Sequence, residues 1–292
     1  DEFSDPDIIR VGEDYYLAGT TMHSVPGLVV LHSKDLVNWE FSSYCFDRFD
    51  DSDDFNLRNG KEAYGQGIWA PAIRYHNGKF YIFSNINGHG LQVYISDSAK
   101  GPWTHHKING DIYDLSVLFD DDGKIYAVHK YGNVTVTELK PDLSGPVEGS
   151  SKVVIPEGNA MGEGHHVYKI NGMYYILSAD YSPMGRMQCA RSKSIWGPYE
   201  TCVISERESY GYAAGWSVGN MGIGRPLPED GFRFQNNQPN GVNLGCATIH
   251  QGGIVQAPDG KWWGVSMLDF NAVGRTVCLS PVTWVDGWPY FG

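Results

Sequence analysis

The chain has 292 residues and a formal net charge of −12 at pH 7, with 22 Lys and Arg against 34 Asp and Glu. Such an acidic chain lacks the basic footprint that phosphate binding requires, which argues against nucleic acid as a partner. No apolar run is long enough to cross a bilayer, so no membrane partner is expected either. The 36 Gly and 15 Pro are scattered between short apolar runs, which favours many strands joined by tight turns.

Paired apolar residues recur along the chain at intervals typical of repeated sheets. The pairs begin at Tyr15, Phe80, Ile125, Tyr174 and Trp262. The middle separations, of 45 and 49 residues, match a four-stranded propeller blade, and the longer ones, of 65 and 88, imply insertions. We therefore predict an all-β fold, a five-bladed β-propeller with a central acidic pocket. Residues 1–292 would form one domain with blades at about 5–46, 67–108, 113–155, 162–204 and 248–292.

The same repeat pattern predicts two features of the C-terminal part of the chain. We expect the fifth blade to hold four strands, at Gly253–Ala257, Trp262–Met267, Arg275–Ser280 and Val282–Trp284. The stretch from Ser205 to Cys246 is rich in Gly, Asn and Pro and shows little periodicity. Long loops in compact domains are usually functional, so this stretch is expected at the rim of the pocket.

Three acidic residues open predicted innermost strands. Counting back eleven residues from Ile125 and from Tyr174 gives Asp114 and Glu163, and counting back ten from Tyr15 gives Asp5. Innermost strands line the axis of a propeller, so equivalent positions on them converge, and we expect these three carboxyl groups to lie close together. Glycoside hydrolysis needs one protonated carboxyl group and a second carboxylate, and clustered carboxyl groups shift one another's pKa.

Each acid taken singly also has an ordinary structural explanation. Asp5 starts an Asp-Pro turn, and Asp114 is a candidate loop cap. Glu163 stands between two glycines and has no capping role. A metal site built from the same three acids is another alternative. Calcium loops, however, show dense acidic spacing with a central Gly, which the run from Asp50 to Asp54 lacks.

An ordered set of motifs resembles glycoside hydrolase family 43 from one end of the chain to the other. In chain order these motifs are Asp5-Pro6-Asp7-Ile8-Ile9-Arg10-Val11, Gly67-Ile68-Trp69-Ala70-Pro71, Asp114-Leu115-Ser116-Val117-Leu118-Phe119, Glu163-Gly164-His165-His166-Val167-Tyr168, His250-Gln251-Gly252-Gly253, and Gly274-Arg275 leading to Trp284-Val285-Asp286-Gly287-Trp288-Pro289. Any one of them is a weak pattern, whereas the ordered set is a specific one. The resemblance implies a five-bladed propeller and an inverting mechanism.

The resemblance also implies roles for individual residues. Asp5 matches the general base, Glu163 the general acid, and Asp114 the residue that tunes the pKa of the acid and orients it. Substrate contacts are implied for four more positions: Arg275, Trp69, Met22 and His250. His250 matches a histidine on the propeller axis that holds a calcium ion in several members. No cofactor is required, and a structural calcium ion near His250 is the one metal that the resemblance suggests.

The sequence departs from the family pattern at two positions. Leu115 and His165 stand where the family usually has Pro, which affects the expected shape of the sugar subsites more than the acids themselves. In related enzymes a β-sandwich follows the Gly-Trp-Pro motif, so we expect a C-terminal β-sandwich in the full-length protein and an exposed apolar patch where it docks. The chain does not determine the location of the protein, which is unknown from the sequence, and a secreted or periplasmic location is slightly favoured over a cytoplasmic one.

The leading functional hypothesis is an exo-acting hydrolase that removes terminal α-L-arabinofuranosyl or β-D-xylosyl units. Its substrates would be arabinoxylan, arabinan or xylo- and arabino-oligosaccharides of the plant cell wall. The stretch from Thr20 to Gly27 resembles the xylosidase and arabinofuranosidase branches more than the endo-arabinanases. An inverting mechanism predicts that the carboxyl groups of Asp5 and Glu163 lie about 6.5–9.5 Å apart, with space for a water molecule.

Three alternatives remain open at the level of sequence. One is a carbohydrate-binding propeller without catalysis, against which the intact set of acids argues. A second is an endo-arabinanase of the same family. The third is a retaining fructan-active propeller, but those enzymes open on Asn-Asp-Pro-Asn, whereas this chain has Ser4-Asp5-Pro6-Asp7.

Overall fold

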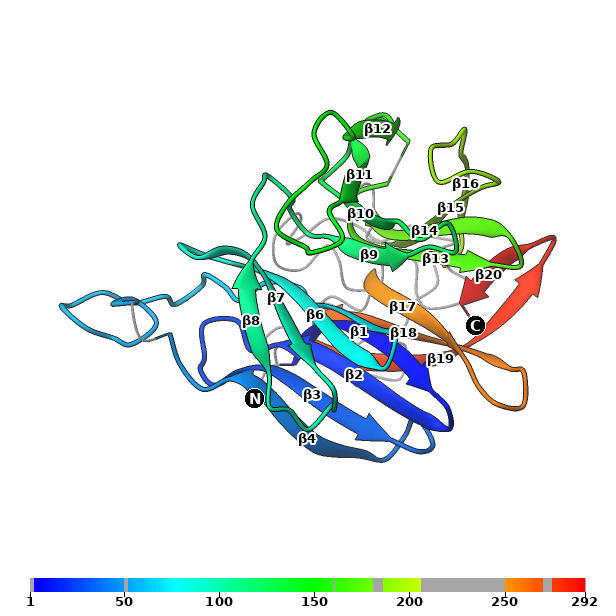
Figure 1. The fold of residues 1–292 in the computed structure, drawn as a ribbon. Helices are drawn as coiled ribbons and strands as arrows, with labels where there is room; N and C mark the ends of the chain where they lie inside the picture. Colours follow the sequence, from blue (N-terminus) through cyan, green and yellow to red (C-terminus); the bar gives the residue numbers. More distant parts are fainter. Residues whose placement is uncertain are drawn as a thin grey trace, which may run out of the picture.

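The computed structural model describes residues 3–49, 52–159, 161–180, 186–205, 250–269 and 275–291. These residues form five four-stranded antiparallel sheets, each built from four strands consecutive in sequence (Figure 1). The predicted stretch from Ser205 to Cys246 lies, after Ser205 itself, outside the described residues. No helix in the described parts of the chain is long and apolar enough to span a membrane.

The five sheets follow one another along the chain. Blade 1 holds β1 (Ser4–Val11), β2 (Asp14–Thr20), β3 (Gly27–Ser33) and β4 (Trp39–Phe46). Blade 2 holds β5 (Ala72–His76), β6 (Lys79–Ile86), β7 (Gly90–Ser96) and β8 (Thr104–Lys107), and blade 3 holds β9 (Ser116–Phe119), β10 (Ile125–His129), β11 (Val134–Leu139) and β12 (Lys152–Ile155). Blade 4 holds β13 (Glu163–Ile170), β14 (Met173–Asp180), β15 (Arg186–Ser192) and β16 (Glu200–Val203), and blade 5 holds β17 (His250–Gln256), β18 (Trp262–Asp269), β19 (Arg275–Val285) and β20 (Trp288–Phe291).

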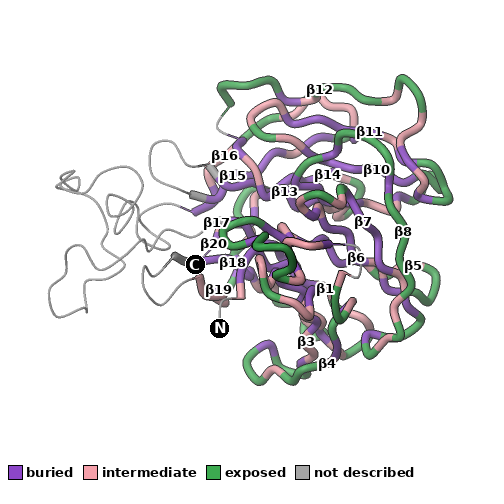
Figure 2. Tube along the Cα trace, turned by 90° about the vertical axis from the view of Figure 1, so that its left-hand side faces the viewer, coloured by how far each residue is buried: buried purple, intermediate pink, exposed green. Residues whose placement is uncertain are grey.

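The first strands of the blades form a closed ring. β1 contacts β5, β5 contacts β9, β9 contacts β13, β13 contacts β17, and β17 returns to β1. Figure 1 shows β4, β8, β12 and β16 at the periphery, and Figure 2 shows that β8 and β12 are largely exposed. The prediction of an all-β, five-bladed propeller is therefore confirmed. Because each blade is continuous in sequence, packing of β17 against β1 closes the ring without a shared strand.

The recurring apolar pairs have a simple physical cause. Side chains alternate between the two faces of a strand, and both faces of a second strand are covered by neighbouring blades. In β6, Phe80 and Ile82 pack into the cluster between blades 1 and 2, whereas Phe83 packs into the cluster between blades 2 and 3. Consecutive apolar residues are thus needed to fill two cores at once.

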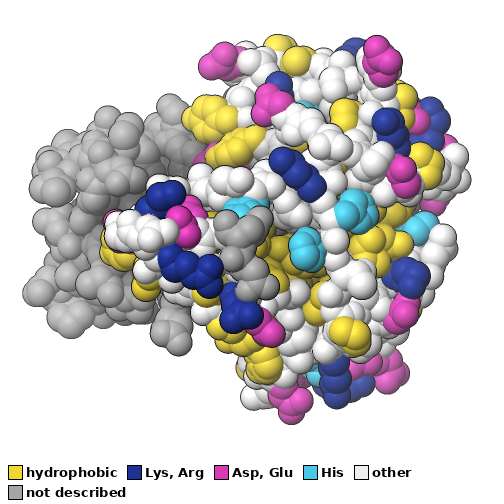
Figure 3. Space-filling view, turned by 60° about the vertical axis from the view of Figure 1, so that its left-hand side comes forward, with side chains coloured by type: hydrophobic (Ala, Val, Ile, Leu, Met, Phe, Trp, Pro, Cys, Tyr) yellow, Lys and Arg dark blue, Asp and Glu magenta, His cyan; other side chains and the backbone are white. Residues whose placement is uncertain are grey.

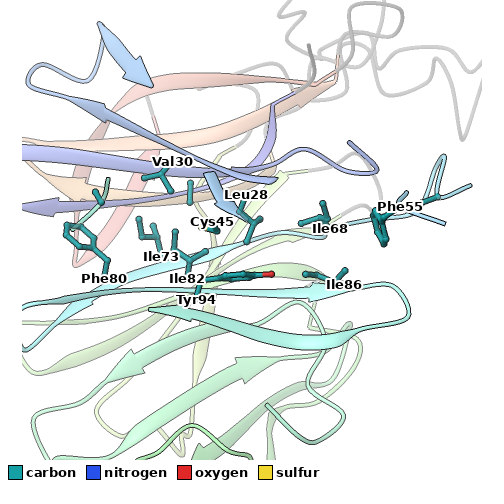
Figure 4. Packing of buried hydrophobic residues seen from close by; sticks show 13 residues of the cluster. Leu28, Val30, Cys45, Phe55, Ile68, Ile73, Phe80, Ile82, Ile86 and Tyr94 are labelled. Atoms are coloured by element: carbon teal, nitrogen blue, oxygen red, sulfur yellow. The ribbon is translucent and has the colours of Figure 1, made fainter. Parts of the chain in front are cut away.

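The core is divided into five clusters, one at each junction between blades. Figure 4 shows the cluster between blades 1 and 2, where Val30 and Leu28 of one blade meet Ile82 and Tyr94 of the next. All four side chains are at most 1% exposed. Burial of this kind contributes roughly 1.5–3 kcal/mol for each large apolar side chain, so the blade junctions supply most of the stability.

The fifth blade differs from the prediction. Arg275–Ser280 and Val282–Trp284, predicted as two strands, form the single strand β19, and the outermost strand is Trp288–Phe291. Pro281 is paired with Trp263 of β18 without interrupting β19, and the pairing of β19 with β20 begins only at Val282. The missing N–H of Pro281 therefore costs that ladder no hydrogen bond.

An apolar groove of about 490 Å³ lies at the junction of blades 1 and 5. Leu17, Leu31 and Trp39 line it from blade 1, and Val277 and Leu279 line it from β19. Arg275 lines the same groove, so the groove reaches the neighbourhood of Asp5, to which Arg275 bonds. The C-terminal β-sandwich expected from the resemblance stays a prediction.

Candidate active site

Four blades share an unusual backbone conformation at the start of the innermost strand. Asp5, Asp114 and Gln251 have φ angles of 51°, 50° and 45°, and Gly164 has 66°. Each stands two residues before the first position of regular strand pairing. Left-handed φ angles are uncommon in residues other than Gly and cost about 1–3 kcal/mol each, and such positions cluster at functional sites. The rim formed by these strand starts is therefore the first place to seek a site.

We predicted that the three carboxylates occupy equivalent positions on their strands, and this is wrong for Glu163. In register, the residue equivalent to Asp5 and Asp114 is Gly164, so Glu163 stands one residue earlier. The cause is unequal turn length: a two-residue turn joins β13 to β14, whereas five residues separate β9 from β10. Counting back a constant number of residues ignored this difference. The residue equivalent to Glu163 in blade 3 is Tyr113.

Hydrogen bonds between blades 3 and 4 bring two of the acids together. The backbone N–H of Gly164 donates to Oδ2 of Asp114 at 2.7 Å, and the hydroxyl of Tyr113 donates to Oε2 of Glu163 at 3.0 Å. Burial, together with the nearby negative charges of Glu163 and Asp5, raises the pKa of Asp114 to about 7 despite the bond from Gly164. A charge effect of this kind requires all three carboxyl groups to be neighbours.

Asp5 has cationic and polar partners. Arg275, the first residue of β19, places Nη1 3.3 Å from Oδ2 of Asp5. The hydroxyl of Ser4 donates to the same oxygen at 2.8 Å. The Asp5 backbone N–H approaches the sulfur of Met267 at 3.5 Å, which ties it to blade 5. Both side-chain partners favour the charged form of Asp5.

The remaining predicted residues lie in connecting segments or at the start of β17. Met22 pairs with Ile68 in an isolated bridge, which places Met22 close to the segment that contains Trp69; both side chains are half-buried. His250 opens β17 opposite Met267, whose sulfur contacts Asp5, but the side chain of His250 lies outside the described residues. The structure thus brings the three acids and Arg275 together, and it places Met22 and Trp69 in neighbouring connecting segments and the backbone of His250 at the start of β17.

The described residues give no support for a metal site. No group of three or more His, Cys, Asp and Glu side chains among them is arranged to hold an ion. Calcium needs six to eight oxygen ligands, and the buried axial carboxylate Asp7 already binds the Arg74 guanidinium and two backbone N–H groups. Calcium near His250 stays a prediction.

Comparison with known proteins identifies the family. The family model described as glycosyl hydrolases family 43 matches residues 2–212, well over half of the chain. The chain belongs to glycoside hydrolase family 43. The resemblance drawn from the ordered motifs is therefore confirmed.

Relatives of this family 43 chain are longer proteins. The chain is 34% identical to a non-reducing-end α-L-arabinofuranosidase of Bacteroides ovatus, over 99% of the chain and 51% of that protein. It is 33% identical to a β-xylosidase of Bacillus subtilis, over 98% of the chain and 54% of that protein. A solved structure of a bifunctional GH43-CE protein of Bacteroides eggerthii is similar with a TM-score of 0.80 and 32% identity, covering 100% of the chain and 34% of the other. The chain spans about half the length of these curated relatives.

The departure from the family pattern at His165 has a structural explanation. Its Nδ1 lies 2.5 Å from the hydroxyl of Ser178 and its Nε2 2.5 Å from the carbonyl of Lys130. Burial lowers the pKa of His165 to about 4. The imidazole is therefore neutral near pH 7 and holds the start of β13 against blade 3 and β14.

The sequence analysis missed two features of the site. Tyr113 was not singled out, although it directly precedes Asp114 and contacts Glu163. The second feature is a set of polar contacts across the ring, in which Arg74 of β5 bonds to Asp7 of β1 and to Ser116 of β9. The Ser116 hydroxyl in turn accepts from Val167 N–H of β13. These contacts hold the strand starts that carry the acids in register.

Proposed function

We propose that this protein is an inverting, exo-acting glycosidase that removes terminal α-L-arabinofuranosyl or β-D-xylosyl residues. Its substrates are plant cell-wall glycans: arabinoxylan, arabinan or the corresponding oligosaccharides. The observation that carries the proposal is the placement of the three acids at neighbouring strand starts: Gly164, next to Glu163, bonds to Asp114 across blades 3 and 4, and Asp5 stands at the position equivalent to Asp114 in blade 1. A family 43 chain that gathers three carboxyl groups at one rim has the groups that glycoside hydrolysis uses.

The partners of the acids support different roles. Glu163 is assigned as the general acid, because the family resemblance matches it to that role, and the Tyr113 hydroxyl and the Asp114-bonded backbone of Gly164 hold it in place. In the single displacement, the proton of Glu163 passes to the glycosidic oxygen as the bond between that oxygen and the anomeric carbon breaks. Asp5 acts as the general base, because Arg275 and the Ser4 hydroxyl favour its carboxylate form. It takes a proton from the water that attacks the opposite face of the sugar.

Asp114 holds Glu163 in place through the adjacent backbone. Its carboxyl group accepts the N–H of Gly164, the residue after Glu163. Trp69, Met22 and Arg275 are proposed to contact the terminal sugar, and His250 to lie at the axis behind it. The exo mode and the choice of sugar are supported by the relatives, which are named as an arabinofuranosidase and as a β-xylosidase.

Two nitrophenyl glycosides test the proposal. Purified protein is assayed on the α-L-arabinofuranoside and on the β-D-xyloside, with Asp5→Asn prepared in parallel to exclude a contaminating enzyme, because loss of the base stops the attack of water whatever the leaving group. We expect hydrolysis of at least one glycoside by the wild-type protein and none above background by the variant. Binding of pentose oligosaccharides with no hydrolysis of any of them would instead support a carbohydrate-binding propeller. Release of internal fragments from linear arabinan would support an endo-arabinanase.

A further inference from the structure

A second hollow lies between blades 1 and 2, here called the blade 1–2 groove. Its volume is about 490 Å³, within the range of roughly 300–1,000 Å³ typical of small-molecule pockets. The residues that matter for its chemistry are Tyr16, Phe41, Tyr75, Phe80, Glu40 and Lys100. None of them belongs to the candidate active site.

The groove lies at the opposite end of the blades from the acids. Asp5 stands at the start of β1, whereas Val11, at the end of β1, lines the groove. The two residues are six positions apart along the strand, which corresponds to roughly 20 Å. Figure 4 shows the same polarity in the core, with Phe80 at one end of the cluster and Ile68, next to Trp69, toward the other. A ligand in the groove therefore leaves the acids accessible.

Aromatic side chains from both blades form the walls of the groove. Phe41 of β4 is 58% exposed and Tyr75 of β5 is 42% exposed. The Tyr75 ring packs on Phe80 at 4.8 Å between centroids, and Phe80 packs edge-on against Tyr16 at 4.9 Å. A packed ring presents a large, rigid surface at low cost in conformational entropy. Sugar C–H faces pack on surfaces of this kind.

The polar groups of the groove are suited to a neutral ligand. Asp14 is paired with His32 and Lys34, and Asp97 is paired with Lys79, which leaves Glu40 and Lys100 as charges of opposite sign. No other described residue hydrogen-bonds or ion-pairs with the Glu40 carboxylate or the Lys100 ammonium. The hydroxyls of Tyr16 and Tyr75 likewise have no hydrogen-bond partner among the described residues. Donors and acceptors without net charge match a chain of sugar hydroxyls better than an ion.

Figure 3 shows one face of the molecule, on which charged and hydrophobic side chains are interspersed. The groove combines exposed aromatic rings with unpaired polar groups in one concave site.

We propose that the blade 1–2 groove is a non-catalytic binding site for a short stretch of a pentose-based polysaccharide. Tyr75 and Phe41 supply the stacking surfaces, and Glu40, Lys100 and the two tyrosine hydroxyls bond to the sugar hydroxyls. The ligand class rests on the proposed function. When the groove binds one stretch of a polymer, other branches of the same polymer stay close to the acids. The concentration of chain ends near the acids is therefore raised.

Affinity electrophoresis in native gels that contain soluble arabinoxylan, xylan or arabinan tests the site. Every protein carries Glu163→Gln so that the polymer stays intact, and the test variant adds Phe41→Ala and Tyr75→Ala. The control adds Val285→Ala instead, which removes an exposed apolar side chain, 49% exposed, from blade 5. We expect the double change to weaken polymer binding about tenfold, as removal of aromatic anchors usually does, and the control to bind unchanged.

The same groove changes in an otherwise wild-type chain separate the site from catalysis. On a nitrophenyl pentoside, kcat/KM should stay within about twofold of wild type. Equal retardation of the double variant and the control overturns the groove proposal, as does the absence of retardation by every polymer. A protein that is retarded through the groove but hydrolyses no pentoside would overturn the proposed function instead. Thermal unfolding of each variant shows that the fold is retained.

Discussion

The backbone N–H of Gly164 donates a 2.7 Å hydrogen bond to the carboxyl group of Asp114, which ties the residue after Glu163, the proposed general acid, to the neighbouring blade. Gly164 has a φ angle of 66°, and a Cβ at this position would lie 2.2 Å from Cγ of Gln251. A larger residue would have to displace the side chain of Gln251 in blade 5 and adopt a strained left-handed φ. The Glu-Gly pair is therefore a geometric requirement of the site.

Replacing Glu163 tests the general acid. Glu163→Gln keeps the size of the side chain and its acceptor for Tyr113 but cannot deliver a proton, so activity on natural pentosides should fall by about 10²–10⁴-fold. Glycosides with good leaving groups, which need less protonation, should lose much less. Comparison of kcat for nitrophenyl and alkyl pentosides measures the difference. A near wild-type rate on the poor leaving group would show that another residue supplies the proton.

Tyr113 positions this acid, and its loss should change the pH profile. The hydroxyl bonds to Oε2 of Glu163 and favours the charged carboxylate. In Tyr113→Phe the alkaline limb of the kcat/KM profile should move to higher pH, and kcat should fall about tenfold, the effect of one charge-assisted hydrogen bond. An unshifted alkaline limb would show that the tyrosine hydroxyl has no part in the ionisation of the acid.

The raised pKa of Asp114 should make the free energy of unfolding depend on pH. Its pKa is raised to about 7, so the folded state binds a proton that the unfolded chain releases near pH 4. Stability due to this group is present below pH 4 and is lost as pH rises to 7, by up to about 4 kcal/mol. Asp114→Asn should therefore be stabilised relative to wild type at pH 8 and much less so at pH 4.

Urea unfolding at several pH values measures this effect. Asp111→Asn is the matched control, because the side chain of Asp111 in the same segment is 92% exposed. Its stability relative to wild type should not vary with pH. A difference between Asp114→Asn and wild type that is equally independent of pH would contradict the burial of Asp114 beside other carboxylates.

The sequence predicted the fold well because its strongest signals are physical requirements of a propeller. Tyr126 and Ile125 face different blade junctions, so the pair has to be apolar wherever the turns fall. The exact strand positions of residues counted across a turn were predicted less accurately. Glu163 was placed one residue out of register because two-residue and longer turns cannot be told apart by a fixed count.

Contacts between strands far apart in the chain could not be predicted from the sequence, for a different reason. Arg74 and Asp7 are 67 residues apart, and only the closed ring of innermost strands brings them together. Tyr113 could have been found, since it directly precedes an acid at a strand start. A hydroxyl next to a candidate carboxylate is a signal worth following in similar sequences.

The Arg74–Asp7 pair should be important for stability. Its side chains are 12% and 1% exposed, and Arg74→Met would leave a buried carboxylate without its cation. We expect a loss of about 3–5 kcal/mol in the free energy of unfolding. Lys79→Met is the control, because the Lys79–Asp97 pair is exposed and should contribute less than about 1 kcal/mol. Equal losses for the two variants would show that the axial contacts do not stabilise the ring.

The anomeric configuration of the first product tests the central claim most directly. The assignment of Asp5 as base and Glu163 as acid requires a single displacement, with the carboxyl groups about 6.5–9.5 Å apart. Proton NMR during the first minutes of hydrolysis should show β-L-arabinofuranose from an α-L-arabinofuranoside, or α-D-xylose from a β-D-xyloside. A product that first appears with retained configuration would contradict the account and make one carboxylate a nucleophile.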